Sequence, residues 1–367
     1  MTRIEVSLKK LEDRSYSIFV GHRCLAELER ILSELELKGS VFIVTDDNTN
    51  ELWARKIKKH LEHISECVKT ISIPPGEEQK SLRTIEKLAR KLINMEADRT
   101  STLVAVGGGV IGDITGFLAS IFLRGVAFIN IPTTLLAQVD SSVGGKTGVD
   151  LVEGKNLVGT FYQPRLVFTD VDFLSTLPRE EFLNGMAEVI KYGIIMDYDF
   201  FEFLEANVEK ILGRDPDVLV KTVSHCCKLK RNVVEDDEKE SGLRRILNFG
   251  HTIAHSVESA SNYRVKHGWA VAVGMVAATL IAVGREIIEP DDARRIETLI
   301  GRFGLPVSLP ENLSSELIIN GLSFDKKRRK GVLHWVLPRK IGSVEVVTGI
   351  TRGEIKNAIE KLQGKSL

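Results

Sequence analysis

Short apolar runs alternate with amphipathic segments along the first half of the chain. A turn of prolines and charged residues, PPGEEQKS, opens one such segment at 81–95, which has the pattern of a helix. This β-α-β alternation predicts an α/β fold with a mostly parallel sheet and helices on both of its faces. The runs interpreted as buried strands are 41–45, 68–73, 103–106, 127–131 and 166–170.

Two further pairs of apolar runs predict small pieces of β structure near the ends of the chain. The runs at 4–8 and 16–20 flank a charged turn, which is typical of a hairpin. The runs at 333–337 and 344–347 are short and close together, and they predict a small ribbon.

A chain of 367 residues is longer than a single hydrophobic core usually supports, so two domains are expected. After Pro178 the alternation ends, and helical periods dominate to about residue 300. We therefore predict an α/β domain at 1–178 and a largely α-helical domain at 179–367.

The charge balance excludes one class of partner. Fifty basic and fifty acidic residues give a formal net charge of zero, so the chain lacks the basic excess expected of a nucleic-acid-binding protein. Any affinity for anions must then come from local clusters of cations.

The first residues and the cysteines favour a cytoplasmic location. Cys24, Cys67, Cys226 and Cys227 form no CxxC pair, which is typical of reduced thiols in the cytosol. The first residues, MTRIEVSLKKLEDRS, lack the continuous apolar run of a signal peptide. The apolar runs are expected to be too short to span a membrane, so we expect no membrane partner.

A glycine-rich turn predicts a nucleotide site. Gly107, Gly109 and Gly112 form G-x-G-x-x-G directly after a strand, where glycine lets the backbone approach a pyrophosphate at a helix N-terminus. The alternative is glycine that serves only close packing. The pattern departs from the usual fingerprint, because no acid ends the next strand. Asp113 follows at once instead, and the strand-ending acid Asp46 lies upstream.

Three of the eight histidines predict a metal site. His251 and His255 lie one helical turn apart, and His267 follows at the start of an apolar segment. Spacing alone nominates the first two as ligands, although hydrogen-bonded core histidines are the alternative. Glu188, in the apolar stretch NGMAEVIKYG, is the best candidate to complete a three-ligand site. A salt bridge to Lys191 is its alternative role.

Three clusters of charged residues are candidates for anion binding. The first is a polar, glycine-rich segment, QVDSSVGGKTGVDLVEGKNLVG, which is interpreted as a loop. It carries Asp140, Lys146, Lys155 and Asn156. The alternative is a solvated loop.

The second cluster precedes the histidines and contains Lys230, Glu240, Arg244 and Asn248. The spacing of Arg244, Asn248 and His251 predicts that one helix presents all three side chains to one pocket. The third cluster, FDKKRRKG, includes Lys326 and has the composition of a solvated face. Together the residues favour redox or lyase chemistry on a phosphorylated polyol, with a metal and a nucleotide.

The motifs closely resemble those of the dehydroquinate synthase family of sugar phosphate cyclases, in order and over nearly the whole chain. Ala254 and Ser256 stand where glycine and alanine are expected, a departure that should affect helix packing more than chemistry. The matching pieces are GEEQKS, GGGVIGD, FLRGV, PTTLLAQVDSSVGGKTGVD, GKNLVGTFYQP, FLSTLPREEF, GMAEVIKYG, VVEDDEKESGLRRILNFGHT, HGWAVAVGM and DKKRRKGVLHWVLP.

The resemblance implies a homodimer with NAD in the first domain and an active site between the domains. It implies that one zinc or cobalt ion is held by Glu188, His251 and His267, whereas His255 is an acid/base residue on the phosphate side. The implied substrate is 3-deoxy-arabino-heptulosonate 7-phosphate. Transient oxidation, loss of phosphate by β-elimination, reduction and an internal aldol step would give 3-dehydroquinate.

The resemblance also implies two sets of binding residues. The substrate set is Asp140, Lys146, Asn156, Lys191, Lys230, Glu240, Arg244, Asn248, His255, Lys326 and, from the partner subunit, Arg124. The NAD set is Asp46, Asn48, Glu77, Lys80, Gly108, Gly109, Asp113, Thr133, Thr134, Lys146, Lys155, Phe173 and Thr176.

Three other functions are alternatives. A metal-dependent alcohol dehydrogenase of the glycerol type would accumulate NADH and has no need of so many cations. A sister cyclase would act on another sugar phosphate, although Arg244 and Asn248 favour a substrate with a carboxylate. A non-catalytic scaffold would hold no metal.

Overall fold

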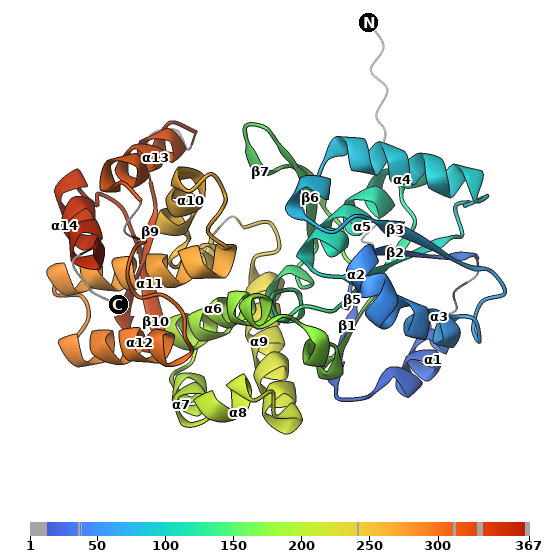
Figure 1. Ribbon diagram of the computed structural model, residues 1–367, viewed down its shortest axis with the longest axis horizontal. Helices are drawn as coiled ribbons and strands as arrows, with labels where there is room; N and C mark the ends of the chain where they lie inside the picture. Colours follow the sequence, from blue (N-terminus) through green and yellow to red (C-terminus); the bar gives the residue numbers. More distant parts are fainter. Residues whose placement is uncertain are drawn as a thin grey trace, which may run out of the picture.

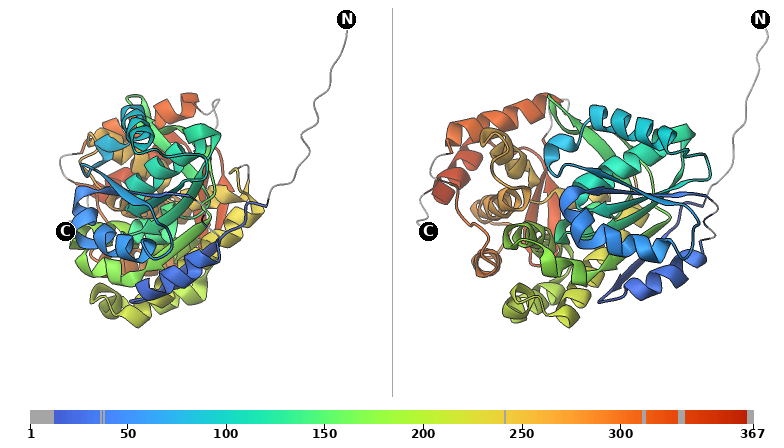
Figure 2. Two further views of the ribbon diagram at one scale, coloured as in Figure 1. Left: turned by 90° about the vertical axis from the view of Figure 1, so that its right-hand side faces the viewer. Right: turned by 45° about the vertical axis from the view of Figure 1, so that its right-hand side comes forward.

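The protein consists of a sheet half and a helical half that lie side by side (Figures 1 and 2). The computed structural model describes residues 13–35, 37, 39–240, 242–310, 313–328 and 333–363, with the backbone alone at 323–328. The largest hydrophobic core belongs to the helical half but includes Leu135, Val139 and Val143 from the sheet half. The two halves are therefore packed together through a shared core. The boundary at residue 178 stays a prediction.

The sheet half is built on six parallel strands. Five of them match the predicted apolar runs within a residue or two, and every neighbouring pair is parallel. The sixth, β1, forms one edge and pairs with β8, whereas its predicted hairpin partner at 4–8 lies outside the described residues. In sheet order the strands are β1 (Ser17–Gly21), β8 (Leu166–Asp170), β5 (Ala127–Pro132), β4 (Thr102–Gly107), β2 (Val41–Asp46) and β3 (Val68–Ile73).

Alternate residues of the strands enter two separate cores, one on each face of the sheet. Phe42 and Val44 pack with α4 (Leu82–Asn94) and α5 (Gly109–Ile121) on one face. Ile43 faces the other way, where α1 (Leu25–Ser33) and α3 (Arg55–Leu61) cover the sheet (Figure 1). The prediction of helices on both faces is confirmed. Short turns of helix at the strand ends are α2 (Asp47–Thr49), η1 (Asn50–Ala54), η2 (Glu77–Gln79), η3 (Phe122–Arg124), η4 (Ala137–Ser141) and η5 (Val171–Thr176).

The predicted glycine-rich loop is wrong, because the segment is an antiparallel hairpin of β6 (Lys146–Leu151) and β7 (Gly154–Phe161). Gly148 and Gly159 lie opposite each other in the ladder, and a Cβ on Gly159 would overlap the carbonyl oxygen of Thr147. The glycines therefore serve close approach of two backbones rather than an irregular conformation. The hairpin packs on α5 and rises between the two halves (Figure 1).

The helical half surrounds the apolar helix α11 (His267–Gly284), which packs against α6, α10, α12, α14 and β9. The late apolar runs form an antiparallel ribbon, as predicted. The four cysteines are free thiols, also as predicted. The remaining elements are α6 (Arg179–Met196), α7 (Tyr198–Ala206), α8 (Val208–Leu212), α9 (Pro216–Asp236), η6 (Leu243–Asn248), α10 (His251–Ala260), α12 (Pro290–Arg302), α13 (Ser315–Arg328), β9 (Trp335–Lys340), β10 (Ser343–Val347) and α14 (Arg352–Gln363).

One helix corrects the expectation that no apolar run reaches membrane-spanning length. Over the described part of the chain, α11 alone has the length and apolar composition to cross a membrane. However, 72% of its residues are buried inside the protein. Its apolar character is explained by its place in the core, where neighbouring helices cover it on several sides.

The contact between α10 and α11 gives a first testable prediction. A Cβ on Gly274 would overlap the carbonyl oxygen of Gly250, whereas Gly284, at the end of the same helix, has no atom within 4 Å of such a Cβ. We expect Gly274→Ala to lower the free energy of unfolding by about 1–3 kcal/mol through overpacking. Gly284→Ala is the matched control and should be neutral or slightly stabilising. Urea unfolding of both variants checks this, and equal stabilities would contradict it.

Candidate active site

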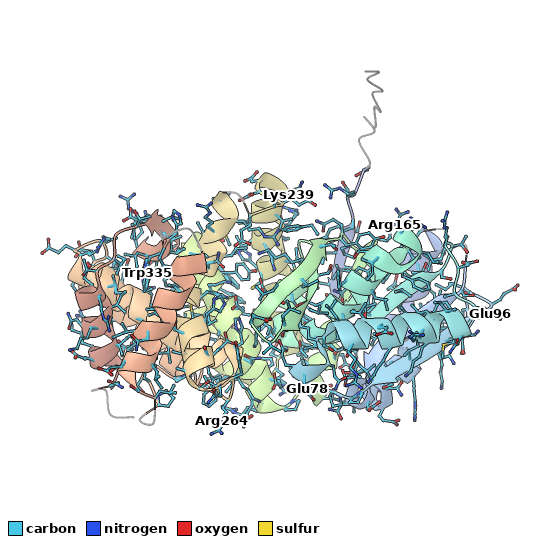
Figure 3. All side chains as sticks on the ribbon, turned by 90° about the horizontal axis from the view of Figure 1, so that it is seen from above. Glu78, Glu96, Arg165, Lys239, Arg264 and Trp335 are labelled. Atoms are coloured by element: carbon cyan, nitrogen blue, oxygen red, sulfur yellow. The ribbon has the colours of Figure 1, made fainter. Side chains whose placement is uncertain are left out.

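A cavity of about 1140 Å³ opens between the sheet half and the helical half. Two residues labelled in Figure 3 mark the two halves that line it. Glu78 lines the cavity from the sheet half, and Arg264 precedes Val265, which lines it from the helical half. Except for Lys146, every residue predicted to bind NAD lines this cavity. The lining residues from the predicted sets are Asp46, Asn48, Glu77, Lys80, Gly108, Gly109, Asp113, Thr133, Thr134, Asp140, Lys155, Asn156, Phe173, Thr176 and His267.

The sheet topology explains the unusual order of the glycine turn and its acid. After β2 the chain adds β3 on one side, whereas after β4 it adds β5 on the other side. The order in which strands are added therefore reverses between β2 and β4. Because these two strands are paired in parallel, Asp46 at the end of β2 lies beside Gly107 at the end of β4. Open α/β sheets bind ligands at such a switch point, outside the carboxyl ends of the strands.

The glycine turn itself leaves no room for larger side chains. Gly108 is the N-cap of α5, and a Cβ there would lie 3.0 Å from Thr134. A Cβ on Gly109 would lie 3.1 Å from the hydroxyl oxygen of Ser141. Backbone amides at the start of α5 therefore face the cavity without a side chain in between, an arrangement suited to a phosphate anion.

A buried lysine ties the nucleotide side of the cavity together. Lys80 forms a 2.6 Å ion pair with Asp113 and donates a 2.5 Å hydrogen bond to Oδ1 of Asn156. Burial lowers the pKa of Lys80, but the neighbouring carboxylates of Asp113 and Glu77 raise it by more, so the amine stays charged. The lysine thus connects the helix after the glycine turn to the β6–β7 hairpin.

At the other end of the cavity, an aromatic pair holds the linker between the halves. The indole N–H of Trp53 donates a 2.8 Å hydrogen bond to the hydroxyl of Thr176, and its ring lies 4.9 Å from that of Phe173. Phe173 and Thr176, both predicted to bind NAD, therefore have a structural partner as well as a place in the cavity wall.

The three predicted metal ligands meet at one point. Glu188 is fully buried on α6, and its Oε1 lies 3.5 Å from Nε2 of His251 and 3.5 Å from Nε2 of His267. Oε1 has no hydrogen-bond partner. Ligand atoms about 2.1 Å from a tetrahedral zinc ion are about 3.4 Å apart, so the spacing fits a shared divalent ion. Among the described residues these three form the one such cluster, and its donor set suits zinc or cobalt.

The two roles predicted as alternatives for Glu188, metal ligand and salt bridge to Lys191, are compatible in the structure. Its Oε2 forms an ion pair with Lys191 on the same helix, which leaves Oε1 for the histidines. His255 lies outside the cluster, with its ring centroid 5.7 Å from that of His251. The interpretation from the HxxxH spacing alone, with both of its histidines as ligands, is therefore not supported by the geometry.

The protonation of the cluster follows from its charges. Burial raises the pKa of Glu188, but Lys191 and His251 outweigh burial and lower it to about 2. Burial lowers the pKa of His251 to about 3, which keeps that imidazole neutral and able to bind a metal. Burial also lowers the pKa of His267, but Glu188 and Glu258 raise it to about 9.

A second buried charge network adjoins the metal cluster. Lys230 donates a 2.7 Å hydrogen bond to Oδ1 of Asp140, and the hydroxyl of Tyr192 donates a 3.0 Å bond to the same oxygen. Burial raises the pKa of Asp140, but Lys230 and Lys191 hold it well below its usual range. Two lysines and one acid of the predicted substrate set are thus brought together.

The predicted single helix carrying Arg244, Asn248 and His251 is wrong. Arg244 and Asn248 belong to the 3₁₀ turn η6, and α10 begins only at His251, after Gly250. Gly250 has a φ of 78°, and a Cβ there would lie 2.8 Å from Met275 of α11. The close packing of α11 therefore requires the glycine and breaks the helix.

Arg244 and Asn248 of η6 do not face one pocket from a helix. They bind residues that lie just before the hairpin and just after α9. The guanidinium of Arg244 is buried and donates hydrogen bonds to the carbonyls of Gly144 (3.3 Å) and Glu238 (2.6 Å). Asn248 donates a 2.8 Å bond to Oε1 of Glu240, whose other oxygen pairs with Lys146. Asn248 is therefore linked through Glu240 to the first strand of the hairpin, and Arg244 is linked to the backbone just before that strand.

Of the predicted substrate set, Asp140 and Asn156 line the cavity, whereas the other members whose side chains the structure describes are not among its lining residues. Arg124 is exposed in η3 and does not line the cavity, which leaves its supply from a partner subunit a prediction. Lys326 belongs to α13, and its side chain lies outside the described residues.

The sequence analysis missed Glu258 and Asn184. Glu258 is 3% exposed, and its Oε2 lies 3.6 Å from Nδ1 of the predicted ligand His267. Asn184 accepts a 2.5 Å hydrogen bond from the amide of Gly268, which fixes the start of α11. The acid in HSVES, one turn after His255, was a signal for Glu258. Nothing in the sequence signalled Asn184.

Comparison with known proteins assigns the family. The model described as 3-dehydroquinate synthase N-terminal matches residues 70–184, and that described as 3-dehydroquinate synthase C-terminal matches residues 185–328. The chain belongs to the 3-dehydroquinate synthase family. The 3-dehydroquinate synthase of Pelobacter propionicus is 47% identical over 338 residues, which cover 92% of this chain and 94% of that protein.

Two solved structures extend the comparison of this 3-dehydroquinate synthase family member. A 2-epi-5-epi-valiolone synthase from Streptomyces hygroscopicus, solved with NAD⁺ and Zn²⁺, has a TM-score of 0.88 and 28% identity, covering 97% of this chain and 99% of the other. A 2-deoxy-scyllo-inosose synthase, solved with carbaglucose-6-phosphate, NAD⁺ and Co²⁺, has a TM-score of 0.87 and 29% identity, with 95% and 97% coverage. The resemblance stated from the motifs is confirmed.

The two residues that depart from the family's motif, Ala254 and Ser256, both lie where helices pack together. Ala254 is fully buried where α10 meets α11, and a Cβ on Gly274 would lie 3.2 Å from its amide nitrogen. Ser256 is buried where α10 meets α13, opposite Gly321. Both lie in contacts between helices, in agreement with an effect on packing.

Proposed function

We propose that this protein is a 3-dehydroquinate synthase, which converts 3-deoxy-arabino-heptulosonate 7-phosphate to 3-dehydroquinate and phosphate. The observation that carries the proposal is the cluster of Glu188, His251 and His267, of which His267 lines the same cavity as the glycine turn, in a chain of this family. We further propose that the protein is a cytoplasmic homodimer and that its ligand is this small phosphorylated sugar acid.

The residues present fit both NAD and a divalent metal ion. Glu188 offers a buried oxygen without a hydrogen bond, and His251 offers a neutral imidazole. When bound, the metal would supply acidification of a substrate hydroxyl, and NAD⁺ would supply a reversible acceptor for a hydride. The two groups would share one cavity, because His267 lines its helical side and Gly108 and Gly109 line its sheet side.

The chain's own residues bind and orient the substrate and hold protons in place. Lys230 and Asp140, joined by a partly buried hydrogen bond, provide a fixed donor and acceptor beside the metal cluster. Arg244 provides a planar fork suited to a carboxylate, and Lys146 and Asn156 provide donors on the hairpin. We assign to His255 the acid/base role on the phosphate side.

The decisive test is phosphate release from the heptulosonate phosphate, with substoichiometric NAD⁺ and added zinc. We expect many turnovers per NAD⁺ and no net NADH. Removal of metal with EDTA should abolish phosphate release, and zinc or cobalt should restore it. Net NADH would favour an alcohol dehydrogenase, and turnover only of sugar phosphates without a carboxylate would favour a sister cyclase. Absence of bound metal would favour a scaffold.

The nucleotide side gives a further prediction. Lys80→Met should weaken NAD⁺ binding about tenfold, because Asp113 and Asn156 lose the ammonium that holds them. Lys87→Met, on the exposed face of α4, the helix that follows Lys80, is the matched control and should leave the affinity unchanged. Calorimetric titration of NAD⁺ measures both variants. An unchanged dissociation constant for Lys80→Met would contradict the assignment.

A further inference from the structure

Glu258 is a buried acid for which neither the metal ligand set nor the predicted binding sets give a role. It lies on α10 and is 3% exposed. A buried carboxylate is costly unless positive groups compensate it. The groups that surround Glu258 therefore indicate its function, and its two oxygens face in different directions.

One oxygen faces a proposed metal ligand. Oε2 of Glu258 lies 3.6 Å from Nδ1 of His267, whose other ring nitrogen, Nε2, lies 3.5 Å from Oε1 of Glu188. The two nitrogens of this imidazole thus face two different carboxylates. A carboxylate behind a ligating histidine fixes the orientation of the ring and its tautomer.

The other oxygen faces the opposite side of the cavity. Oε1 of Glu258 accepts a 3.2 Å hydrogen bond from Nζ of Lys155, which belongs to β7 in the sheet half. The same ammonium lies 3.7 Å from Oε1 of Glu77 and 5.1 Å from the ring centroid of Tyr263. Glu77 and Lys155 both line the cavity and belong to the residues proposed to surround NAD. Glu258 therefore connects the metal side of the cavity to its nucleotide side.

We propose that Glu258 is a positioning residue that holds His267 for the metal and, through Lys155, makes metal binding and NAD⁺ binding strengthen each other. The inference rests on the proposed function. A dinucleotide that contacts the hairpin holds Lys155 in place, which holds Glu258 and in turn the imidazole of His267. A preorganised ligand costs less to order when the metal binds.

Thermodynamic linkage makes the proposal measurable without turnover. We expect the full-length, metal-free protein to bind zinc at least about fivefold more tightly when saturated with NAD⁺, measured by competition with a chromophoric chelator. Linkage also requires zinc to tighten NAD⁺ binding by the same factor, which calorimetry checks.

The variants separate positioning from folding. Glu258→Gln keeps the size of the side chain but removes its charge, and should weaken zinc binding about 10–100-fold and bring the NAD⁺-dependent ratio close to one. Lys155→Met should also bring the ratio close to one, although Lys155 contacts no metal ligand. Glu180→Gln, which removes an exposed acid paired with Lys266, is the control and should keep the wild-type affinity and ratio. Circular dichroism verifies that all variants are folded.

The outcomes distinguish this inference from the proposed function. A wild-type ratio of one, or a wild-type ratio retained in Glu258→Gln, would overturn the inference and leave the metal and NAD⁺ sites standing. Failure of the wild-type protein to bind one zinc ion per chain would overturn the proposed function itself. A folded Glu258→Gln variant whose ratio falls to about one supports the inference.

Discussion

Replacing His267 by alanine is expected to remove the metal and nearly all activity while the fold is kept. Glu188 and His251 alone would leave the ion with two protein ligands, and three are needed for a stable site with open positions. We expect phosphate release to fall at least about a thousandfold, the scale of several kcal/mol of metal stabilisation. Elemental analysis and the phosphate assay measure the two effects.

The fold should survive this substitution because the acids around His267 keep other partners. Glu188 retains Lys191, and Glu258 retains Lys155. His63→Ala is the control, since this exposed histidine contacts Glu29 on the far side of the sheet half. It should keep full metal content and activity. One metal ion per chain in the folded His267→Ala variant would disprove the ligand assignment.

Arg244→Lys is expected to lose most activity even though the positive charge is kept. The guanidinium is buried and donates to the carbonyls of Gly144 and Glu238, and a lysine cannot reproduce this planar fork. Loss of two charged hydrogen bonds to the substrate carboxylate, which the fork is proposed to bind, corresponds to about a hundredfold or more in kcat/KM. Steady-state kinetics of phosphate release measure the loss.

The neighbouring arginine gives a matched control for this prediction. Arg245→Lys changes the same residue type one position along η6, where the side chain is half-buried, and should change kcat/KM little. Thermal unfolding of both variants separates loss of folding from loss of binding. Near-normal turnover of Arg244→Lys would refute the role of the fork.

Features encoded by local pattern were predictable. The runs at 68–73 and 166–170 became strands with the predicted bounds, because a short apolar run between turn residues can be buried on both faces of a parallel sheet. The three histidines and an acid in an apolar helix were enough to predict a metal site, and the resemblance of the motifs, rather than the spacing, chose His267 over His255 as a ligand. Burial of Glu188 requires a compensating charge wherever that helix packs.

Features that depend on packing between distant segments were not predictable. Gly250 looks like any glycine, and only the approach of α11 shows why the helix must break there. The glycines of the hairpin looked like a loop because their purpose, contact between two backbones, is not visible in the order of residues. Asn184 meets Gly268 only because α6 and α11 cross at that point.

The sequence by itself determined the parallel α/β half, the helical half and the family, because periodicity and motifs are local properties. Through the family's motifs it also nominated the three residues that meet at the metal cluster. The tertiary structure alone decided that Asp46 lies beside the glycine turn, since β2 and β4 are paired across sixty residues of chain. It also decided that Glu258 stands between His267 and Lys155. Such neighbours are set by the packing of whole elements, which no short stretch of sequence specifies.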